Sequence, residues 1–192
     1  HASVFSMALC ARLATSFSPL SRDICLCKRT LSLMLEAFGV RPLMEPLTER
    51  EISALISQLL ERLVDRSLGD LAKDEANAVL KTINILMLKL LQHAPRERTL
   101  CALLALLTGR AVSMLEQQCQ FDDLLLKCLS KLTKTLGPIA AQLDLGPILF
   151  SLHELFAARP AQPALNAADA MLHELLTHRR AALLEALAAR MP

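Results

Sequence analysis

The sequence lacks tryptophan and tyrosine, and aromatic residues make up only 3% of its 192 residues. Glycine is also scarce, with 5 residues, although hydrophobic residues reach 53%. A β-protein usually fills its core with β-branched and aromatic residues and needs many tight turns. Here the apolar mass is leucine, alanine, isoleucine, valine and methionine, of which leucine and alanine are strong helix formers. The composition therefore predicts an all-α fold.

A large charge of one sign is missing as well, because the formal net charge is only +2. Nucleic-acid-binding domains usually carry a strong basic excess, so we expect no nucleic-acid partner. No apolar run reaches the ~18 uncharged residues that a transmembrane helix needs. The N-terminus lacks the basic, apolar and small-residue order of a signal peptide. We interpret the chain, which begins at His1, as a cytoplasmic piece of a longer protein that does not bind a membrane.

Six cysteines could carry chemistry: Cys10, Cys25, Cys27, Cys101, Cys119 and Cys128. They lie within leucine-rich helical patterns, where a free cysteine behaves as a small hydrophobe. We expect reduced thiols packed in the core of an intracellular protein. Cys25 and Cys27 stand two residues apart, so on a helix they point to nearly opposite sides and cannot share a metal ion. No second pair stands at zinc-binding spacing.

Other catalytic patterns are equally incomplete. The segment "HELLTH" places His173 and His178 five residues apart, whereas a zinc protease needs a separation of four. Neither a P-loop nor a dinucleotide-binding fingerprint is present. We therefore expect no cofactor, no metal and no enzymatic activity. An enzyme that depends on a thiol or a metal stays the remote alternative, because a Cys–His pair can meet in space without any local motif.

Proline, glycine and capping residues divide the chain into roughly eight to ten helices. Thr48 and Glu51 form a capping box, and Pro95 and Gly137-Pro138 are stop signals. The expected helices cover residues 2–16, 19–38 after an N-cap at Ser18, 48–67, 71–94, 96–108, 111–136, 147–158 and 165–191, the last as one or two helices. The connector around Pro42 and Pro46 separates two of them. Short connectors predict HEAT-like antiparallel helix pairs stacked as a short α-solenoid in a single domain, residues 1–192, with a compact bundle as the alternative.

The segment "FDDLLLKCLSKLTK", residues 121–134, has the clearest two-sided pattern. One face is apolar and carries Phe121, Leu124, Leu125, Cys128, Leu129 and Leu132. Asp123, Lys127, Lys131 and Lys134 fall on the other face, where Asp123 can pair with Lys127. The lysine stripe is either an ordinary solvated face or a docking surface for an acidic partner.

The segment "KTINILMLKLLQHA", residues 81–94, is more apolar than a simple surface helix. Its second face mixes Ile85 and Leu88 with polar residues, which predicts an inner helix with part of that face also covered. Lys81 and Lys89 are weaker candidates for a partner surface. Their stems can cross apolar neighbours while their ammonium groups stay in water, so we expect them mainly to keep a crowded seam soluble.

Several segments together resemble one known family. "KTINILMLKLLQHA", "RERTLCALLALL", "FDDLLLKCLSKLTKTL", "LDLGPILFSLHELF" and "MLHELLTHRRAALLEAL" occur in the order found in the C-terminal region of the TOG-domain microtubule polymerases, the ch-TOG and Mini spindles family. The resemblance covers most of residues 20–187. Its most specific parts are "INILMLK" and "KCLSKLTK" at the right separation, and their collinear order makes the match specific.

The resemblance implies a stack of HEAT-like helix pairs, which agrees with the fold predicted from the pattern. It also implies a parent protein that accelerates microtubule growth at plus ends through upstream tubulin-binding TOG domains. Members of the family work at spindle poles, centrosomes, kinetochores and cortical arrays. Their C-terminal region is associated with localisation and with adaptors such as the TACC coiled-coil proteins.

One departure from the family pattern concerns tubulin. Tubulin-binding TOG domains present a tryptophan on their first inter-helix loop, and this chain has none. The Pro42–Pro46 connector offers only Leu43 and Met44 as exposed apolar candidates. We therefore expect a docking and localisation domain that binds an adaptor rather than tubulin in the usual TOG manner. Direct, weak microtubule binding through Lys127, Lys131 and Lys134 is the alternative.

Overall fold

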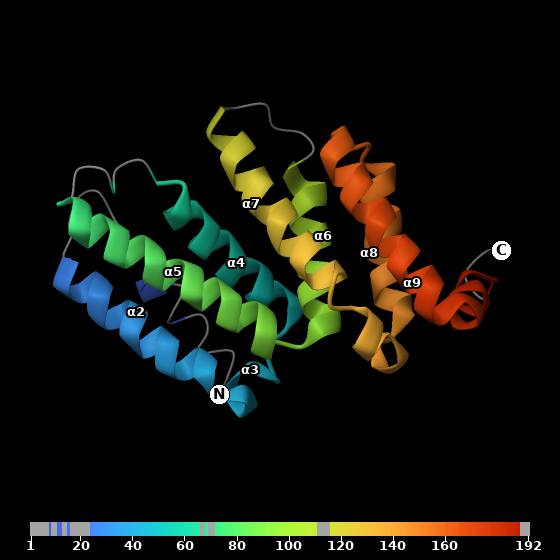
Figure 1. The fold of residues 1–192 in the computed structure, drawn as a ribbon, viewed down its shortest axis with the longest axis horizontal. Helices are drawn as coiled ribbons and strands as arrows, with labels where there is room; N and C mark the ends of the chain where they lie inside the picture. Colours follow the sequence, from blue (N-terminus) through green and yellow to red (C-terminus); the bar gives the residue numbers. More distant parts are fainter. Residues whose placement is uncertain are drawn as a thin grey trace. The chain divides into compact units, whose positions relative to one another are not determined.

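The computed structural model describes residues 24–65, 68, 72–110 and 116–188, together with Ala8, Ala11, Arg12 and Thr15 (Figure 1). The chain divides into two compact units, His1–Thr99 and Leu100–Pro192, and each is described by itself. The expectation of a single domain over residues 1–192 stays a prediction.

Every regular element in the described residues is a helix, which confirms the predicted all-α class. The elements are α2 (Ile24–Gly39), α3 (Arg41–Met44), α4 (Glu49–Leu63), α5 (Lys73–His93), α6 (Arg96–Arg110), α7 (Glu116–Thr133), the 3₁₀ helix η2 (Gly137–Gln142), α8 (Leu145–Ala157) and α9 (Gln162–Ala188). None of the helices described is both long enough and apolar enough to cross a bilayer. Most of the helix expected at residues 2–16, and its neighbouring cap at Ser18, lie outside the described residues.

Local signals set several helix ends where the sequence predicts them. The capping box is confirmed, because Thr48 Oγ1 accepts from the amide of Glu51 at 3.3 Å and the Glu51 carboxylate accepts from the amide of Thr48 at 2.8 Å. Helix α5 ends just before Pro95. Helix α8 begins at Leu145, earlier than expected, because Asp144 accepts from the amide of Gly146 at 2.9 Å and caps it.

Two connectors differ from the expectation, because each contains a short helix. Pro42 is the second residue of α3 and Pro138 the second residue of η2, within the first turn, where a fixed φ suits a helix and no amide donor is needed. The turn of α3 buries Met44, which is 2% exposed, so its expected exposure was wrong; Leu43 is 41% exposed. Helix α6 also passes through Gly109, the residue expected to end it, and continues to Arg110.

Unit 1 is organised around α5, which packs against both α2 and α4. Helices α2 and α5 run parallel: Lys28 Nζ meets Glu75 Oε1 at 2.8 Å near their first turns, and His93 Nδ1 bonds the carbonyl of Phe38 near their last turns. Helix α4 runs in the opposite direction to α5 (Figure 1). In a stack of antiparallel helix pairs, the first helix of one pair runs parallel to the first helix of the next pair and antiparallel to the helix between them. Helices α2, α4 and α5 have this relation.

Unit 2 repeats this scheme around α9, which packs against α7, η2 and α8. Helices α7 and α9 run in the same direction and α8 in the opposite one (Figure 1). Each unit thus packs neighbouring helices side by side, which agrees with the predicted HEAT-like α-solenoid of helix pairs.

An arginine holds the connector in each unit. Arg98 Nη1 donates to the carbonyls of Leu47 at 2.8 Å and Glu45 at 3.4 Å. Arg179 Nη1 donates to the carbonyls of Ala140 at 2.8 Å, Ala141 at 3.1 Å and Leu143 at 3.3 Å. These arginines donate to carbonyl groups at the ends of α3 and η2, where the last carbonyl groups of a helix have no amide donor within the helix. At Arg179 the backbone leaves the helical conformation (φ −140°, ψ 36°), so α9 consists of two helical segments that meet at a kink.

We expect Arg179→Ala to lower the free energy of unfolding of unit 2 by about 2 kcal/mol, because it removes a charged donor shared by several carbonyl groups. Urea unfolding followed by circular dichroism measures this. Arg180→Ala is the matched control, because Arg180 is the exposed neighbour of Arg179 and its loss should change stability by less than about 0.5 kcal/mol. Equal destabilisation by the two changes would contradict the role given to Arg179.

Candidate docking site on helix α7

Helix α7 places its apolar face in the core and its lysines on the surface. Phe121 and Leu132 are 2% exposed, and Leu125 and Leu129 are fully buried. On the opposite face Lys127, Lys131 and Lys134 are exposed. Lys134 follows the last assigned residue of α7, but its amide still bonds the carbonyl of Ser130 at 3.1 Å, so it continues the helical row. The two faces predicted for this segment are confirmed.

The three lysines line an open depression of about 800 Å³ beside α9. Its remaining lining comes from Asp123, Leu126, Ser130 and Thr135 and from Ala167 of α9. Leu126 and Ala167 are half-buried, so they give this surface an apolar strip next to the basic row. Helix α7 therefore presents positive charge next to partly exposed hydrocarbon.

The charge of this row is not cancelled within the described part of the chain. None of the three lysines forms an ion pair with a residue that the structure describes, and the expected pair between Asp123 and Lys127 is not formed there. With a rise of 1.5 Å per residue, the ammonium groups spread over about 10 Å. Such a row attracts acidic groups, and salt weakens that attraction.

Lys81 and Lys89 of α5, the weaker candidates for a partner surface, have different surroundings from each other. Lys81 is exposed, whereas Lys89 Nζ donates to the carbonyl of Leu35 at 3.0 Å. His93 bonds the carbonyl of Phe38, so two α5 side chains satisfy carbonyl groups at the end of α2. A cation at a helix C-terminus is also favoured by the helix dipole. Lys89 therefore joins α5 to α2, and Lys81 keeps its ammonium group on the open surface.

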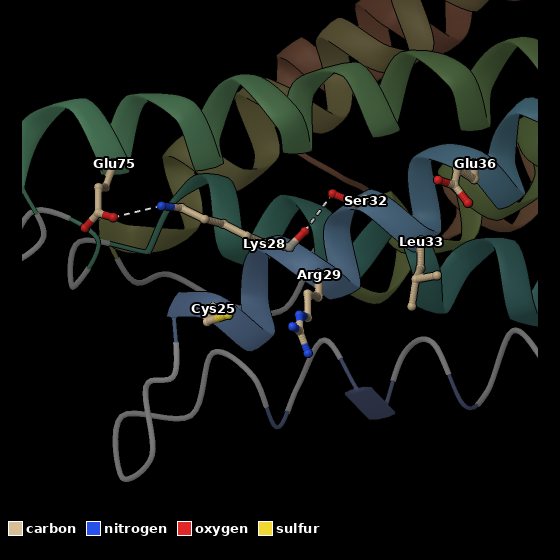
Figure 2. A pocket seen from close by; sticks show the side chains of 7 residues that line it. All are labelled: Cys25, Lys28, Arg29, Ser32, Leu33, Glu36 and Glu75. Atoms are coloured by element: carbon tan, nitrogen blue, oxygen red, sulfur yellow. Dashed lines mark hydrogen bonds and ion pairs between the residues drawn. The ribbon is translucent and has the colours of Figure 1, made fainter.

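A second open depression lies along α2 (Figure 2). In Figure 2 Lys28 turns toward Glu75 on α5, while Arg29 and Leu33 point away from that pair. Leu33 is 61% exposed, and Glu36 adds an acidic group to the same surface. This depression is lined by two basic and two acidic side chains, whereas the α7 depression is lined by three lysines and one aspartate.

The cysteines divide into buried and exposed thiols. Cys27, Cys101 and Cys128 are buried, as expected, whereas Cys25 and Cys119 are exposed, so the expectation of core packing was wrong for these two. Cys10 lies outside the described residues. Cys25 and Cys27 occupy opposite sides of α2, as their spacing predicts. Burial raises the pKa of the Cys128 thiol to about 11, although nearby Lys131 acts in the other direction.

The remaining polar motif also has a plain structural explanation. In "HELLTH", His178 Nε2 lies 3.5 Å from Glu174 Oε2, one turn earlier on α9, and His173 is exposed. Within the described ranges, no three His, Cys, Asp or Glu side chains gather as a metal site would require. The α7 row is therefore the most distinctive arrangement of charged groups among the residues described.

Comparison with known proteins places this helical-repeat chain in a family context. No family model and no solved structure matches it. It is 32% identical over 137 residues to "Protein MOR1" of Oryza sativa subsp. japonica, with 66% of this chain and 7% of the relative covered. It is 29% identical over 179 residues to "Protein MOR1" of Arabidopsis thaliana, with 82% of this chain and 9% of the relative covered.

The chain thus spans less than a tenth of the length of these curated relatives. Because the matches extend over most of the chain, they confirm the resemblance predicted from the sequence. That resemblance is to the C-terminal region of the TOG-domain microtubule polymerases.

We expect Lys89→Met to lower the free energy of unfolding of unit 1 by about 1 kcal/mol, since it leaves the Leu35 carbonyl without its second donor. Lys81→Met is the matched control on the same helix and should be neutral to within about 0.5 kcal/mol. Urea unfolding of the two variants compares them directly. A neutral Lys89→Met variant would show that this contact does not stabilise the α2–α5 pair.

Thiol labelling should follow burial. At pH 7.5 we expect an alkylating reagent to modify Cys25 and Cys119 quickly, while Cys27, Cys101 and Cys128 react only in denaturant. The raised pKa keeps the Cys128 thiol protonated, and the thiolate is the reactive form. Peptide mapping by mass spectrometry assigns each site. Fast labelling of Cys128 in the folded protein would contradict its burial and support the thiol-enzyme alternative.

Proposed function

We propose that this chain is a non-enzymatic docking and localisation domain of a microtubule plus-end polymerase. In this proposal it binds an acidic adaptor of the TACC coiled-coil type through the basic face formed by Lys127, Lys131 and Lys134. The observation that carries the proposal is the uncompensated charge of this row beside an apolar strip. The similarity to the MOR1 proteins supplies the family context.

A helix packed in the core holds a row of lysines in a fixed arrangement. The buried face of α7 anchors it in unit 2, so the three lysine backbones are held in one row before a partner arrives. A preformed surface loses little further conformational freedom on binding, apart from the lysine side chains themselves. Like charges in one row also speed the encounter with a partner of opposite charge. These properties suit a module that recruits a parent protein to microtubules and spindle poles.

An adaptor is favoured over tubulin bound in the usual TOG manner. The chain has no tryptophan, and the α2–α4 connector buries Met44 in α3. Arg41 of that connector faces Glu45 at 3.4 Å, so its charge is partly neutralised. The connector therefore lacks the tryptophan that tubulin-binding TOG domains present on their first inter-helix loop.

Direct, weak binding to microtubules is the second candidate. The same uncompensated lysine row favours it, because the tubulin surface is acidic. Both candidates use one face of α7, and they differ in the partner retained. Attraction to an extended acidic surface should decline steeply between low and physiological salt, because exposed charges are screened over about 8 to 10 Å there.

We expect the triple change Lys127→Glu, Lys131→Glu and Lys134→Glu to abolish capture of a TACC-type coiled coil in pull-down assays, because it turns attraction into repulsion. Microtubule co-sedimentation at low salt tests the second candidate with the same protein. The matched control changes Arg50, Lys73 and Arg180 to Glu, which gives the same net charge at exposed positions elsewhere. Capture unaffected by the α7 changes, or lost equally in the control, would refute the docking role of this face.

A further inference from the structure

We infer that Asp123 is a specificity-determining residue of the α7 docking face, which favours a partner with a short acidic cluster over a partner with a continuous acidic surface. This inference rests on the proposed function, because it concerns the same face. It goes further by giving one residue a role against the competing partner, the microtubule surface. Specificity of this kind commonly needs a repulsive element beside the attractive ones.

Asp123 lies at one end of the lysine row. It stands four residues before Lys127, so the two side chains share one stripe of α7. Along the helix axis Asp123 is about 6 Å from Lys127 and about 16 Å from Lys134. Asp123 is exposed, and it lines the same depression as the three lysines. The depression therefore has an acidic end, and the rest of its charge is basic.

The carboxylate of Asp123 keeps its charge available to a partner. The i,i+4 spacing would allow an ion pair with Lys127, but among the contacts of the described residues these two side chains form none. The neighbouring Asp122 is half-buried and has an interaction of its own. Among the described residues that line the depression, Asp123 alone is acidic. It is therefore the group that an approaching carboxylate meets at this end of the row.

The range of the repulsion separates two kinds of partner. Exposed charges are screened over about 8 to 10 Å at physiological salt. A short acidic cluster can centre on Lys131 and Lys134, which lie about 12 and 16 Å from Asp123 along the helix, and so avoid most of the repulsion. A continuous acidic surface, such as that of tubulin, extends past the row and brings some carboxylates close to Asp123. Asp123 therefore opposes the second contact more strongly than the first.

The experiment measures binding of the whole chain to microtubules and to a TACC-type coiled coil side by side. At low salt, we expect Asp123→Asn to raise the affinity for microtubules about threefold, because one exposed repulsive charge is removed. The same variant should change the affinity for the coiled coil by less than about 1.5-fold, so the preference for the adaptor falls about twofold. Asp74→Asn is the matched control, because it makes the same charge change at an exposed position of α5 and should leave that preference unchanged.

Equal gains for both partners in Asp123→Asn, or a gain for neither, would overturn the selective role of Asp123. A gain that persists at high salt would contradict it as well, because screening should remove a repulsion between exposed charges. The lysine variant judges the proposed function separately. Adaptor capture that survives the triple change of Lys127, Lys131 and Lys134 to Glu would refute the docking face itself. Capture lost in that variant, with an unchanged preference in Asp123→Asn, would overturn this inference alone.

Discussion

The architecture depends on one constraint, that each unit has a helix whose apolar stripes are covered by two neighbouring helices. In unit 1 this is α5, between α2 and α4, and in unit 2 it is α9, which packs against α7 and α8. With no tryptophan or tyrosine, the cores must be filled by leucine, methionine and alanine at close spacing. Three-helix packing around α5 and α9 is the arrangement that buries these stripes.

This packing also decides which surface is free for a partner. Helix α7 packs its apolar face into unit 2, and its exposed side, next to the start of α9, carries three lysines in a row. On α5, by contrast, Lys89 is used to join α2, and Lys28 of α2 is paired with Glu75. The lysines of unit 1 that lie on the α2–α5 seam thus hold helices together. The α7 row has no such internal partner among the described residues, and that difference supports its assignment as the docking face.

Local chemistry was predictable from the sequence and long-range contacts were not. The capping box at Thr48, the stop at Pro95 and the two faces of α7 depend on neighbouring residues, so the pattern identified them. The arginine donors to the connector carbonyls and the Lys89 contact join residues far apart in sequence, and no periodicity encodes them. The sequence pattern predicted the row of three lysines on one face of α7. It could not predict the apolar strip beside that row, because Ala167 belongs to another helix.

Hydrogen–deuterium exchange of the whole chain, with and without a saturating TACC-type coiled coil, tests the central claim most directly. The account expects new protection over residues 121–135 and the first turns of α9, where the lysine row and Ala167 line one surface. It expects no change along α2, whose charges are mixed and paired. Protection confined to α2 and α5, with α7 unchanged, would contradict the assignment of the docking face.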